Sequence, residues 1–391
     1  MNARRDIRGD LAGYREILAE IEICQKYGHD YRNDRGLKAE ILARLHPKKL
    51  ELTVSEIITE NANTSTLRLV SPGRALPPFL PGQYLNLAVK VDGIRTGRAY
   101  SISSSSTQTA YYDLTIGRVN NGLVSNYLLD EIKVGDTLTA TGPLGNFYYN
   151  PLFHGKKLVF LAGGTGITPF MSMIRTFTDQ NADLDLLLIY GCRHRSDALF
   201  LPELEQRARL HPNFKYELVL SEPDEGEVGR TGLLDAPLIK ELVGDPANAT
   251  FYICGSSAMQ KFCTGELEAM GVKRRSIRKE AFTAPGDVLA DPAWPQEIRP
   301  EHPVTLTIQQ PDGGAVIIAS RAGESVLAAL ERNGLGVPNG CRTGECSLCR
   351  IRMTSGQVFQ SPGALVRRSD RALGFIHSCQ AYPLTDLTLV I

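Results

Sequence analysis

The sequence predicts a multi-domain protein with a short helical extension at residues 1–48 and three folded parts. Short alternating apolar segments, broken by Gly and Pro, fill residues 49–152 and predict an antiparallel β-barrel. Nearly continuous apolar segments separated by helical stretches fill residues 153–284 and predict an α/β domain with a parallel sheet. After a proline-rich linker at 285–301, alternating segments return in 302–391, which we expect to form a small α+β domain.

Composition excludes several classes of protein. The chain of 391 residues has 43 Lys and Arg against 43 Asp and Glu, so its charge does not favour a nucleic-acid partner. It has no apolar run of about 18 residues, so we expect no membrane span. The first residues, Met1–Asp6, lead into no apolar stretch, so we expect no secretory signal. Eight cysteines are too few for a disulfide scaffold in so long a chain, which favours a reducing, cytoplasmic location.

The extension at 1–48 carries two helical patterns. Apolar residues recur at helical spacing from Leu11 to Ile21 and again from Leu37 to Leu45, with a polar stretch between them. One interpretation is a helical cap packed on the next domain. The other is a docking arm for a partner protein.

The barrel region contains a group of residues suited to a flat, phosphate-bearing ligand. Arg98 offers a guanidinium fork for a phosphate, Tyr100 a ring that can stack on a heterocycle, and Ser101 a hydroxyl for its edge. Downstream, Gly122 precedes a predicted helix, whose N-terminus with the Ser125 hydroxyl suits a pyrophosphate.

The α/β region opens with a glycine-rich turn. Gly163–Phe170 follows the apolar strand Leu158–Ala162 and begins a helix, with Pro169 in its first turn. Such glycines let the backbone approach a pyrophosphate, although ordinary structural turns use the same residues. The position directly after a strand favours the binding interpretation.

The last region contains four cysteines, Cys341, Cys346, Cys349 and Cys379, in the spacing C-x4-C-x2-C followed by 29 residues and a fourth Cys. This is the plant-type spacing for a 2Fe–2S cluster, which passes one electron at a time. Gly340 lies in the loop, where sharp turning is needed. Structural zinc is the competing interpretation, but the x4 gap and the distant fourth Cys match zinc poorly.

These motifs resemble two known families. Residues 50–284 are similar to the ferredoxin–NADP reductase superfamily: R-x-Y-S is matched at Arg98–Ser101, G-x-x-S at Gly122–Ser125, and G-G-T-G-x-x-P at Gly163–Pro169. The region 302–391 resembles plant-type ferredoxins of the β-grasp fold, which implies that the four cysteines are cluster ligands. The resemblance therefore implies an antiparallel β-barrel flavin domain, an α/β nicotinamide domain and an α+β ferredoxin domain.

The resemblance also implies the site residues. The cofactor-binding residues would be Arg98, Tyr100, Ser101, Ile116, Arg118, Gly122, Leu123, Val124, Ser125, Gly164, Thr165, Gly166, Thr168, Pro169, Arg193, Glu222, Cys254, Gly255, Met259 and Phe282. The catalytic residues would be Cys254, Ser101 and Glu280, gathered around the nicotinamide. Taken alone, Cys254 also fits a buried thiol at a strand end. The segment Tyr252–Met259 departs from the family pattern at Ser256, where proline is usual.

The choice of cofactors can be predicted from charge and motif. The acidic run Ser221–Glu225 follows the third strand, where relatives that use NADP often place Ser-Arg, and Glu222 would repel a 2′-phosphate. Arg193 and Arg195 argue the other way, so NADH is favoured and NADPH stays open. The segment Gly122–Ser125 favours FAD over FMN.

The predicted function is NAD(P)H-dependent electron transfer. NADH would reduce FAD, and single electrons would leave through the 2Fe–2S cluster to a partner protein, such as a Rieske or di-iron oxygenase or a hybrid-cluster protein. The alternative is an electron-input subunit of a larger redox complex, docked through residues 1–48.

Overall fold

The computed structural model describes residues 14–26, 47, 49–73, 75–280, 288, 291–310, 313–361 and 364–391. Contacts divide the chain into two units, Met1–Lys48 and Lys49–Ile391. In the first unit the helix α1 (Tyr14–Lys26) overlaps the first predicted helical pattern, of which Leu11 lies outside the described residues. The second predicted pattern, Leu37–Leu45, lies outside the described residues. Within the described ranges, no helix has the length and apolar character needed to cross a bilayer.

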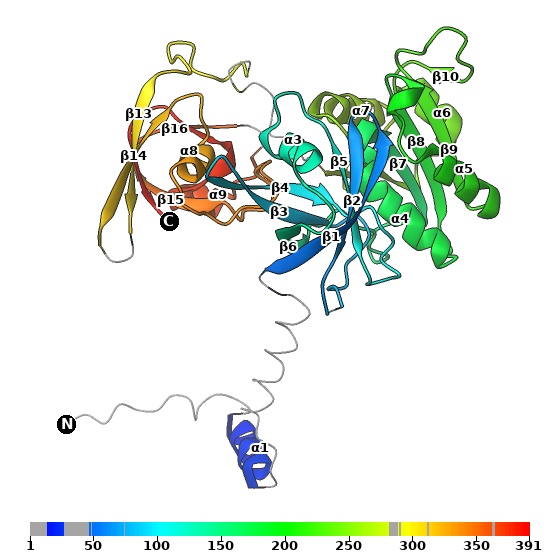
Figure 1. Cartoon of the computed structure of the whole chain (residues 1–391). Helices are drawn as coiled ribbons and strands as arrows, with labels where there is room; N and C mark the ends of the chain where they lie inside the picture. The colour runs from blue at the N-terminus through cyan, green and yellow to red at the C-terminus, as the bar shows by residue number, and fades with distance from the viewer. Residues whose placement is uncertain are drawn as a thin grey trace. The chain divides into compact units, whose positions relative to one another are not determined.

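The first sheet of the larger unit is antiparallel and has the order β4-β3-β6-β1-β2-β5 (Figure 1). Its strands are β1 (Leu50–Asn61), β2 (Thr64–Val70), β3 (Tyr84–Val91), β4 (Ile94–Ser101), β5 (Tyr112–Gly117) and β6 (Thr137–Leu144). An isolated bridge between Ile102 and Leu114 brings the two edges of the sheet together. Inward apolar side chains such as Leu52, Leu87 and Leu114 are fully buried, as strand alternation requires. The helix α3 (Leu123–Asp130) follows β5.

The second sheet has the order β10-β9-β8-β7-β11-β12, and all its strands are parallel. Its strands are β7 (Lys157–Gly163), β8 (Asp185–Cys192), β9 (Phe214–Leu220), β10 (Arg230–Thr231), β11 (Ala249–Cys254) and β12 (Ile277–Glu280). Its helices are α4 (Thr168–Asp179), α5 (Leu201–Leu210), α6 (Ala236–Val243) and α7 (Ser257–Ala269).

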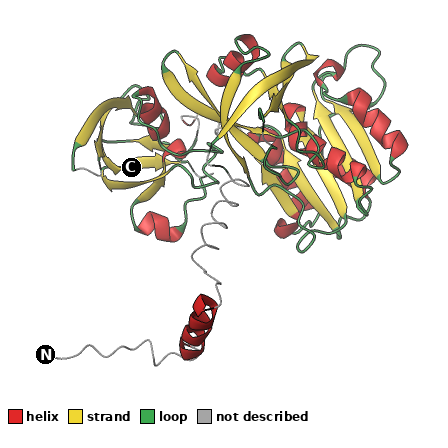
Figure 2. Cartoon of the chain, turned by 60° about the horizontal axis from the view of Figure 1, so that its bottom comes forward, coloured by secondary structure: helices red, strands yellow, loops and turns green. Residues whose placement is uncertain are grey.

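Helices cover both faces of this parallel sheet (Figure 2). Phe170 of α4 and Leu204 of α5 belong to one core, and Ile239 of α6 and Leu267 of α7 belong to the other. Both faces are therefore buried, which explains why the strands are nearly continuous apolar runs in the sequence.

The third sheet has the order β14-β13-β19-β15-β17, and a two-stranded ribbon pairs β16 with β18. The strands are β13 (Pro303–Gln309), β14 (Ala315–Arg321), β15 (Arg350–Ser355), β16 (Val358–Gln360), β17 (Phe375–His377), β18 (Ala381–Pro383) and β19 (Leu387–Val390). The helix α8 (Val326–Arg332) packs its apolar side on this sheet, and α9 (Arg368–Ala372) precedes β17. The antiparallel pair β13–β14, with β19 parallel to β13, matches the predicted α+β domain.

The segment before this sheet is packed against it. Trp294 is 4% exposed, and its ring lies 5.2 Å from Phe359 and 6.3 Å from Tyr382, measured between centroids. Trp294 also donates from Nε1 to the carbonyl of Ile298 at 3.0 Å. Residues in the predicted linker therefore belong to a small core shared with the β16–β18 ribbon.

Candidate functional site

The predicted flavin residues lie on the edge strand β4 of the barrel. Arg98 and Tyr100 share one side of the strand, whereas Ser101 points the opposite way. Ser101 is 4% exposed, and its Oγ has no hydrogen-bond partner in the described part of the chain. A buried hydroxyl of this kind is costly unless a ligand bonds to it, so Ser101 fits the edge of a bound ring.

The predicted phosphate-binding turn stands at the start of α3. No side chain caps this helix at Gly122, and a Cβ placed there would lie 2.4 Å from Ser125 Oγ. The Ser125 hydroxyl accepts from the Val119 N–H at 3.3 Å. The Gly therefore leaves room for the serine hydroxyl, which also donates to Asn126 Oδ1 at 3.3 Å, so a phosphate oxygen bound at this helix N-terminus would replace Asn126 as its acceptor.

The neighbouring strand β5 places two further predicted residues differently. Ile116 is fully buried in the barrel core. Arg118 forms a bidentate ion pair with Asp130, with Nη1–Oδ2 at 2.9 Å and Nη2–Oδ1 at 2.6 Å. The Leu123 side chain is exposed and the Val124 side chain is buried in the barrel core. These two residues could therefore contact a ligand at the start of α3 through their backbone N–H groups.

The glycine-rich turn after β7 makes close backbone contact with the end of β11. A Cβ on Gly166 would lie 2.2 Å from the carbonyl oxygen of Cys254, and one on Gly163 would lie 2.2 Å from Met259 Sδ. The Thr168 hydroxyl donates to the carbonyl of Thr165 at 3.0 Å and begins α4. Only glycine fits at position 166, because the neighbouring atoms there are backbone, whereas the neighbour of Gly163 is the flexible Met259 side chain.

The segment after β11 explains the departure at Ser256. Its hydroxyl accepts from the Met259 N–H at 3.2 Å and so caps α7. A Ser at an N-cap satisfies an orphan N–H, so Ser256 stabilises the helix start where proline is usual. Met259 Sδ then lies against both Gly163 and Gly255.

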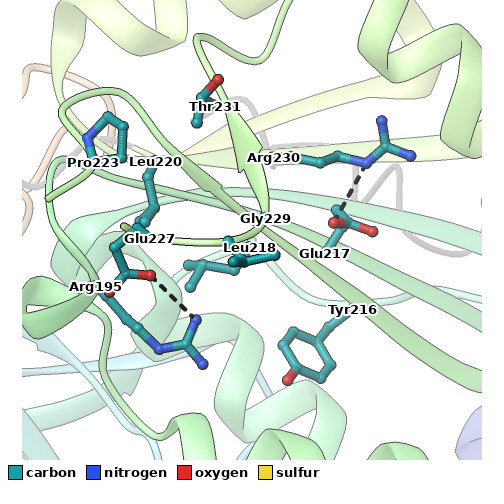
Figure 3. Close-up of a pocket in the computed structure, with 11 residues that line it drawn as sticks. Arg195, Tyr216, Glu217, Leu218, Leu220, Pro223, Glu227, Gly229, Arg230 and Thr231 are labelled. Atoms are coloured by element: carbon teal, nitrogen blue, oxygen red, sulfur yellow. Dashed lines mark ion pairs between the residues drawn. The ribbon is translucent and has the colours of Figure 1, made fainter. Parts of the chain in front are cut away.

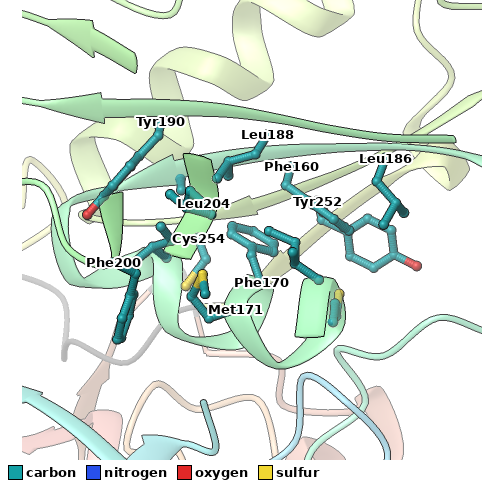
Figure 4. Packing of buried hydrophobic residues seen from close by; sticks show 14 of the residues in the cluster. Phe160, Phe170, Met171, Leu186, Leu188, Tyr190, Phe200, Leu204, Tyr252 and Cys254 are labelled. Atoms are coloured by element: carbon teal, nitrogen blue, oxygen red, sulfur yellow. The ribbon is translucent and has the colours of Figure 1, made fainter. Parts of the chain in front are cut away.

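Cys254 ends β11 within one core of the parallel sheet (Figure 4), and Glu280 is its partner at the end of the neighbouring strand β12. They are 2% and 6% exposed, and burial raises the pKa of each well above its ordinary value. Gln260 Nε2 donates to the carbonyls of Glu280 at 2.8 Å and Gly255 at 3.1 Å, which holds the two strand ends together. The Cys254 thiol is therefore neutral at pH 7, and burial disfavours the charged form of the Glu280 carboxyl.

The third predicted catalytic residue, Ser101, stands opposite Tyr84, and the Tyr84 ring lies near Glu280. Ser101 and Tyr84 are partners across β4 and β3. A Cβ on Gly145 would lie 3.0 Å from the Tyr84 ring and 3.5 Å from Glu280 Oε1, so both side chains lie next to Gly145. The ends of β3, β4, β11 and β12 therefore meet there.

The residues predicted to select the dinucleotide lie next to one another. The Glu222 N–H donates to the carbonyl of Arg193 at 2.9 Å. His194 lies between two acids, with Nε2 at 3.7 Å from Glu222 and Nδ1 at 3.5 Å from Asp224. The Arg193 side chain lies next to another acid, with Nε at 3.6 Å from Asp197 Oδ2.

The loop that follows Glu222 covers a pocket of about 280 Å³ at the edge of the sheet (Figure 3). Arg195 pairs with Glu227 at 4.0 Å on one side of it, and Arg230 pairs with Glu217 at 3.3 Å on the other. Arg193 and Arg195 are thus each close to an acid of this chain, although both side chains stay largely exposed.

The four cysteines gather as two pairs. Cys349 Sγ lies 3.2 Å from Cys379 Sγ, and Cys341 Sγ accepts from the backbone N–H groups of Cys346 and Thr343, each at 3.4 Å. In the described part of the chain, no three His, Cys, Asp or Glu side chains converge on one ion position. Two pairs of thiols fit the two irons of a 2Fe–2S cluster better than they fit a single zinc ion.

Residues of its own domain pack against the cysteine loop and bond to its backbone. Gly344 has φ of 82°, and a Cβ there would lie 2.9 Å from Ala364. Its carbonyl lies 2.7 Å from Nδ1 of the fully buried His377. Arg342 adopts φ of 58°, uncommon for a residue with a side chain, and Gln380 Nε2 fixes its carbonyl at 2.7 Å.

The same loop packs against the barrel. Asn86 Nδ2 on β3 donates to the carbonyl of Asn339 at 2.9 Å. A Cβ on Gly340 would lie 3.4 Å from the Tyr84 hydroxyl. On β4, the Thr96 hydroxyl bonds both Glu331 and Arg342. The cluster ligands therefore lie beside the strands that carry the flavin motif, which is the proximity that electron transfer requires.

Comparison with known proteins agrees with this arrangement. Family models match in order: an oxidoreductase FAD-binding domain at residues 49–149, an oxidoreductase NAD-binding domain at 160–265, and a 2Fe-2S iron-sulfur cluster binding domain at 309–384. The glycine betaine monooxygenase reductase subunit of Pseudomonas aeruginosa is 32% identical over 349 residues, which cover 85% of this chain and 93% of that relative. The chain belongs to the family of flavoprotein reductases that carry a 2Fe–2S domain.

Two further similarities agree with this assignment. One component of the Escherichia coli 1,2-phenylacetyl-CoA epoxidase is 29% identical over 351 residues, with 87% of this chain and 96% of the relative covered. The structure of phthalate dioxygenase reductase superposes with a TM-score of 0.65 at 23% identity, over 88% of this chain and 98% of that one, and so supports the fold. The predicted fold class, the flavin, nicotinamide and 2Fe–2S cofactors, and the oxidoreductase function are confirmed.

Some site residues escaped the sequence analysis, and one lies outside the described residues. Tyr84, Thr96, Glu331 and Arg342 connect the barrel to the cysteine loop, and no local motif marks them. Phe282 is the predicted residue that the structure does not describe. The role of each predicted site residue and the domain boundaries stay predictions.

Proposed function

We propose that this reductase takes electrons from NADH through FAD and the 2Fe–2S cluster and delivers them to an oxygenase partner. The observation that carries the proposal is the packing of the cysteine loop on β3 and β4, beside the end of β12. When bound, the flavin accepts a hydride from the nicotinamide and releases electrons singly, and the cluster carries one electron at a time.

The flavin would be held by residues of the barrel. Arg98 would bind its phosphate, the α3 N-terminus with Ser125 would bind the phosphate chain, and Tyr100 would lie against the ring. Ser101 would bond the ring edge with its unpartnered buried hydroxyl. FAD is favoured over FMN because the Gly122–Ser125 segment is of the FAD type.

The nicotinamide would lie against Cys254 and Glu280. The turn formed by Gly164, Thr165, Gly166, Thr168 and Pro169 would hold the pyrophosphate, with Gly255 and Met259 closing the other side. Burial disfavours the charged forms of this thiol and this carboxyl, so the two groups would exclude water and orient the ring with little negative charge beside it.

Two finer parts of the proposal concern the donor and the acceptor. Glu222 would accept from a free ribose hydroxyl and repel a 2′-phosphate, which favours NADH. An oxygenase acceptor is supported by the relatives that serve monooxygenase and epoxidase systems. The cytoplasm, which keeps thiol ligands reduced, is the proposed location.

An anaerobic titration of the purified protein tests the proposal. NADH should bleach flavin and cluster absorption together, with about three electrons taken up per chain, two by the flavin and one by the cluster. Steady-state rates with NADH and NADPH, with ferricyanide as acceptor, should favour NADH. Uptake of only about two electrons contradicts the cluster route, and a clear NADPH preference contradicts the role of Glu222.

A further inference from the structure

A buried polar junction joins the flavin strand to the cysteine loop. The Thr96 hydroxyl accepts from Arg98 Nη1 at 3.0 Å and from Arg342 Nη2 at 3.0 Å, and it donates to Glu331 Oε2 at 3.1 Å. One hydroxyl has one donor and two acceptor positions, so Thr96 uses its full capacity here. Two guanidinium groups from different domains are thereby held on a single oxygen atom.

The charges in this junction do not cancel. Arg342 also pairs with Glu331, and their side chains are 13% and 8% exposed. Arg98, Arg342 and Glu331 together carry one net positive charge in a setting sheltered from water. Burial and the nearby Arg342 lower the pKa of Arg98 to about 10, with Glu331 acting in the opposite direction. A second anion would stabilise two guanidiniums placed so closely.

Arg342 is positioned for such an anion. Its Nε is buried and has no hydrogen-bond partner among the described residues, so its guanidinium keeps donor capacity. The left-handed backbone at Arg342, held by Gln380, turns the side chain out of the cysteine loop and onto β4. Strain of this kind is kept where the surrounding structure requires it.

We propose that Arg342, carried by the cysteine loop, completes the flavin phosphate site with Arg98 and thereby couples flavin binding to docking of the 2Fe–2S domain. The inference rests on the proposed role of Arg98. A phosphate shared by the two guanidiniums neutralises the junction and ties the loop to β4. By linkage, docking of the domain tightens flavin binding by the same factor.

The test compares flavins with and without a phosphate. Full-length protein freed of flavin is titrated with FAD, FMN and riboflavin, and binding is followed by flavin fluorescence. Arg342→Gln should weaken FAD and FMN about tenfold or more while riboflavin changes little, because a charge-assisted hydrogen bond to phosphate is lost. Equal changes for all three flavins, or none, overturn the inference.

Matched variants make the result specific. Arg350→Gln removes another arginine next to a cysteine ligand, one that pairs with Asp370, and should leave the ratio of FMN to riboflavin affinity unchanged. Arg342→Lys keeps the charge and should weaken FAD and FMN less than Arg342→Gln does. It also provides the measurement if Arg342→Gln fails to fold. Arg98→Gln separates the two proposals: if it lowers the ratio and the Arg342 variants do not, only the present inference fails, and if Arg98→Gln has no effect, the proposed flavin site fails.

Discussion

Replacing Glu280 with Gln should stabilise the reductase at neutral pH and above. Glu280 is 6% exposed, its Oε2 lacks a hydrogen-bond partner among the described residues, and burial raises its pKa well above 4.5. The folded chain therefore holds a proton that the unfolded chain releases. Because the unfolded state binds fewer protons, stability falls as pH rises above 4.5, until the folded carboxyl itself ionises.

The size of the effect follows from the pH interval. Each pH unit between the unfolded pKa and the higher folded pKa of Glu280 costs about 1.4 kcal/mol. Gln has nearly the shape of the neutral acid and carries no such cost. We expect the midpoint of thermal unfolding of Glu280→Gln to exceed that of the native chain by about 3 °C or more at pH 7, and by little near pH 4.

The assay is thermal unfolding of both proteins between pH 4 and pH 8, with Asp113→Asn as a control. Asp113 is also buried, at 5% exposure, but its carboxylate accepts from Arg68 Nε at 2.9 Å and Nη2 at 3.1 Å. Its replacement leaves the guanidinium without this partner and should cost about 1 kcal/mol or more at pH 7. A Glu280→Gln protein no more stable than the native chain at pH 8, or a gain that is the same at every pH, refutes the reasoning.

Three further predictions concern the cofactors. Cys379→Ser should abolish the EPR signal of the reduced cluster and the NADH–cytochrome c activity but spare NADH–ferricyanide activity; loss of both activities contradicts the proposed order of electron transfer. Gly166→Val should raise KM for NADH about tenfold or more with an unchanged flavin spectrum, because its Cβ would lie 2.2 Å from the Cys254 carbonyl oxygen; an unchanged KM contradicts the placement of the pyrophosphate. Glu222→Gln should raise kcat/KM for NADPH about tenfold and leave that for NADH within a few-fold, since a repulsive charge is removed; an unchanged ratio of the two contradicts the role of Glu222.

Features set by short stretches of sequence were predictable. Cys341, Cys346 and Cys349 lie in one loop, so their spacing alone predicts shared ligation, and Cys379 follows from the family pattern. The turn around Gly166 was predictable for the same reason, since a strand, glycines and a helix start follow one another directly.

Features set by long-range contacts were not predictable. Thr96 and Glu331 are 235 positions apart, and in the sequence they belong to an ordinary strand and an ordinary amphipathic helix. Arg118 is the opposite case. Its local motif suggests cofactor binding, but the fold pairs it with Asp130. The raised pKa of Glu280 likewise depends on burial by other segments, which one sequence without a fold does not reveal.

The packing of Trp294 bears on how the 2Fe–2S domain could be exchanged between reductases. A fragment that begins at the first strand, Pro303–Gln309, would lack Trp294 and leave the rings of Phe359 and Tyr382 exposed to water. Such a fragment would tend to aggregate or lose its ribbon, since large aromatic surfaces need cover. A transplantable unit should therefore start before Val288, which lies in the same small core. The 2Fe–2S domain that can fold by itself is therefore longer than the segment that its cysteine motif marks.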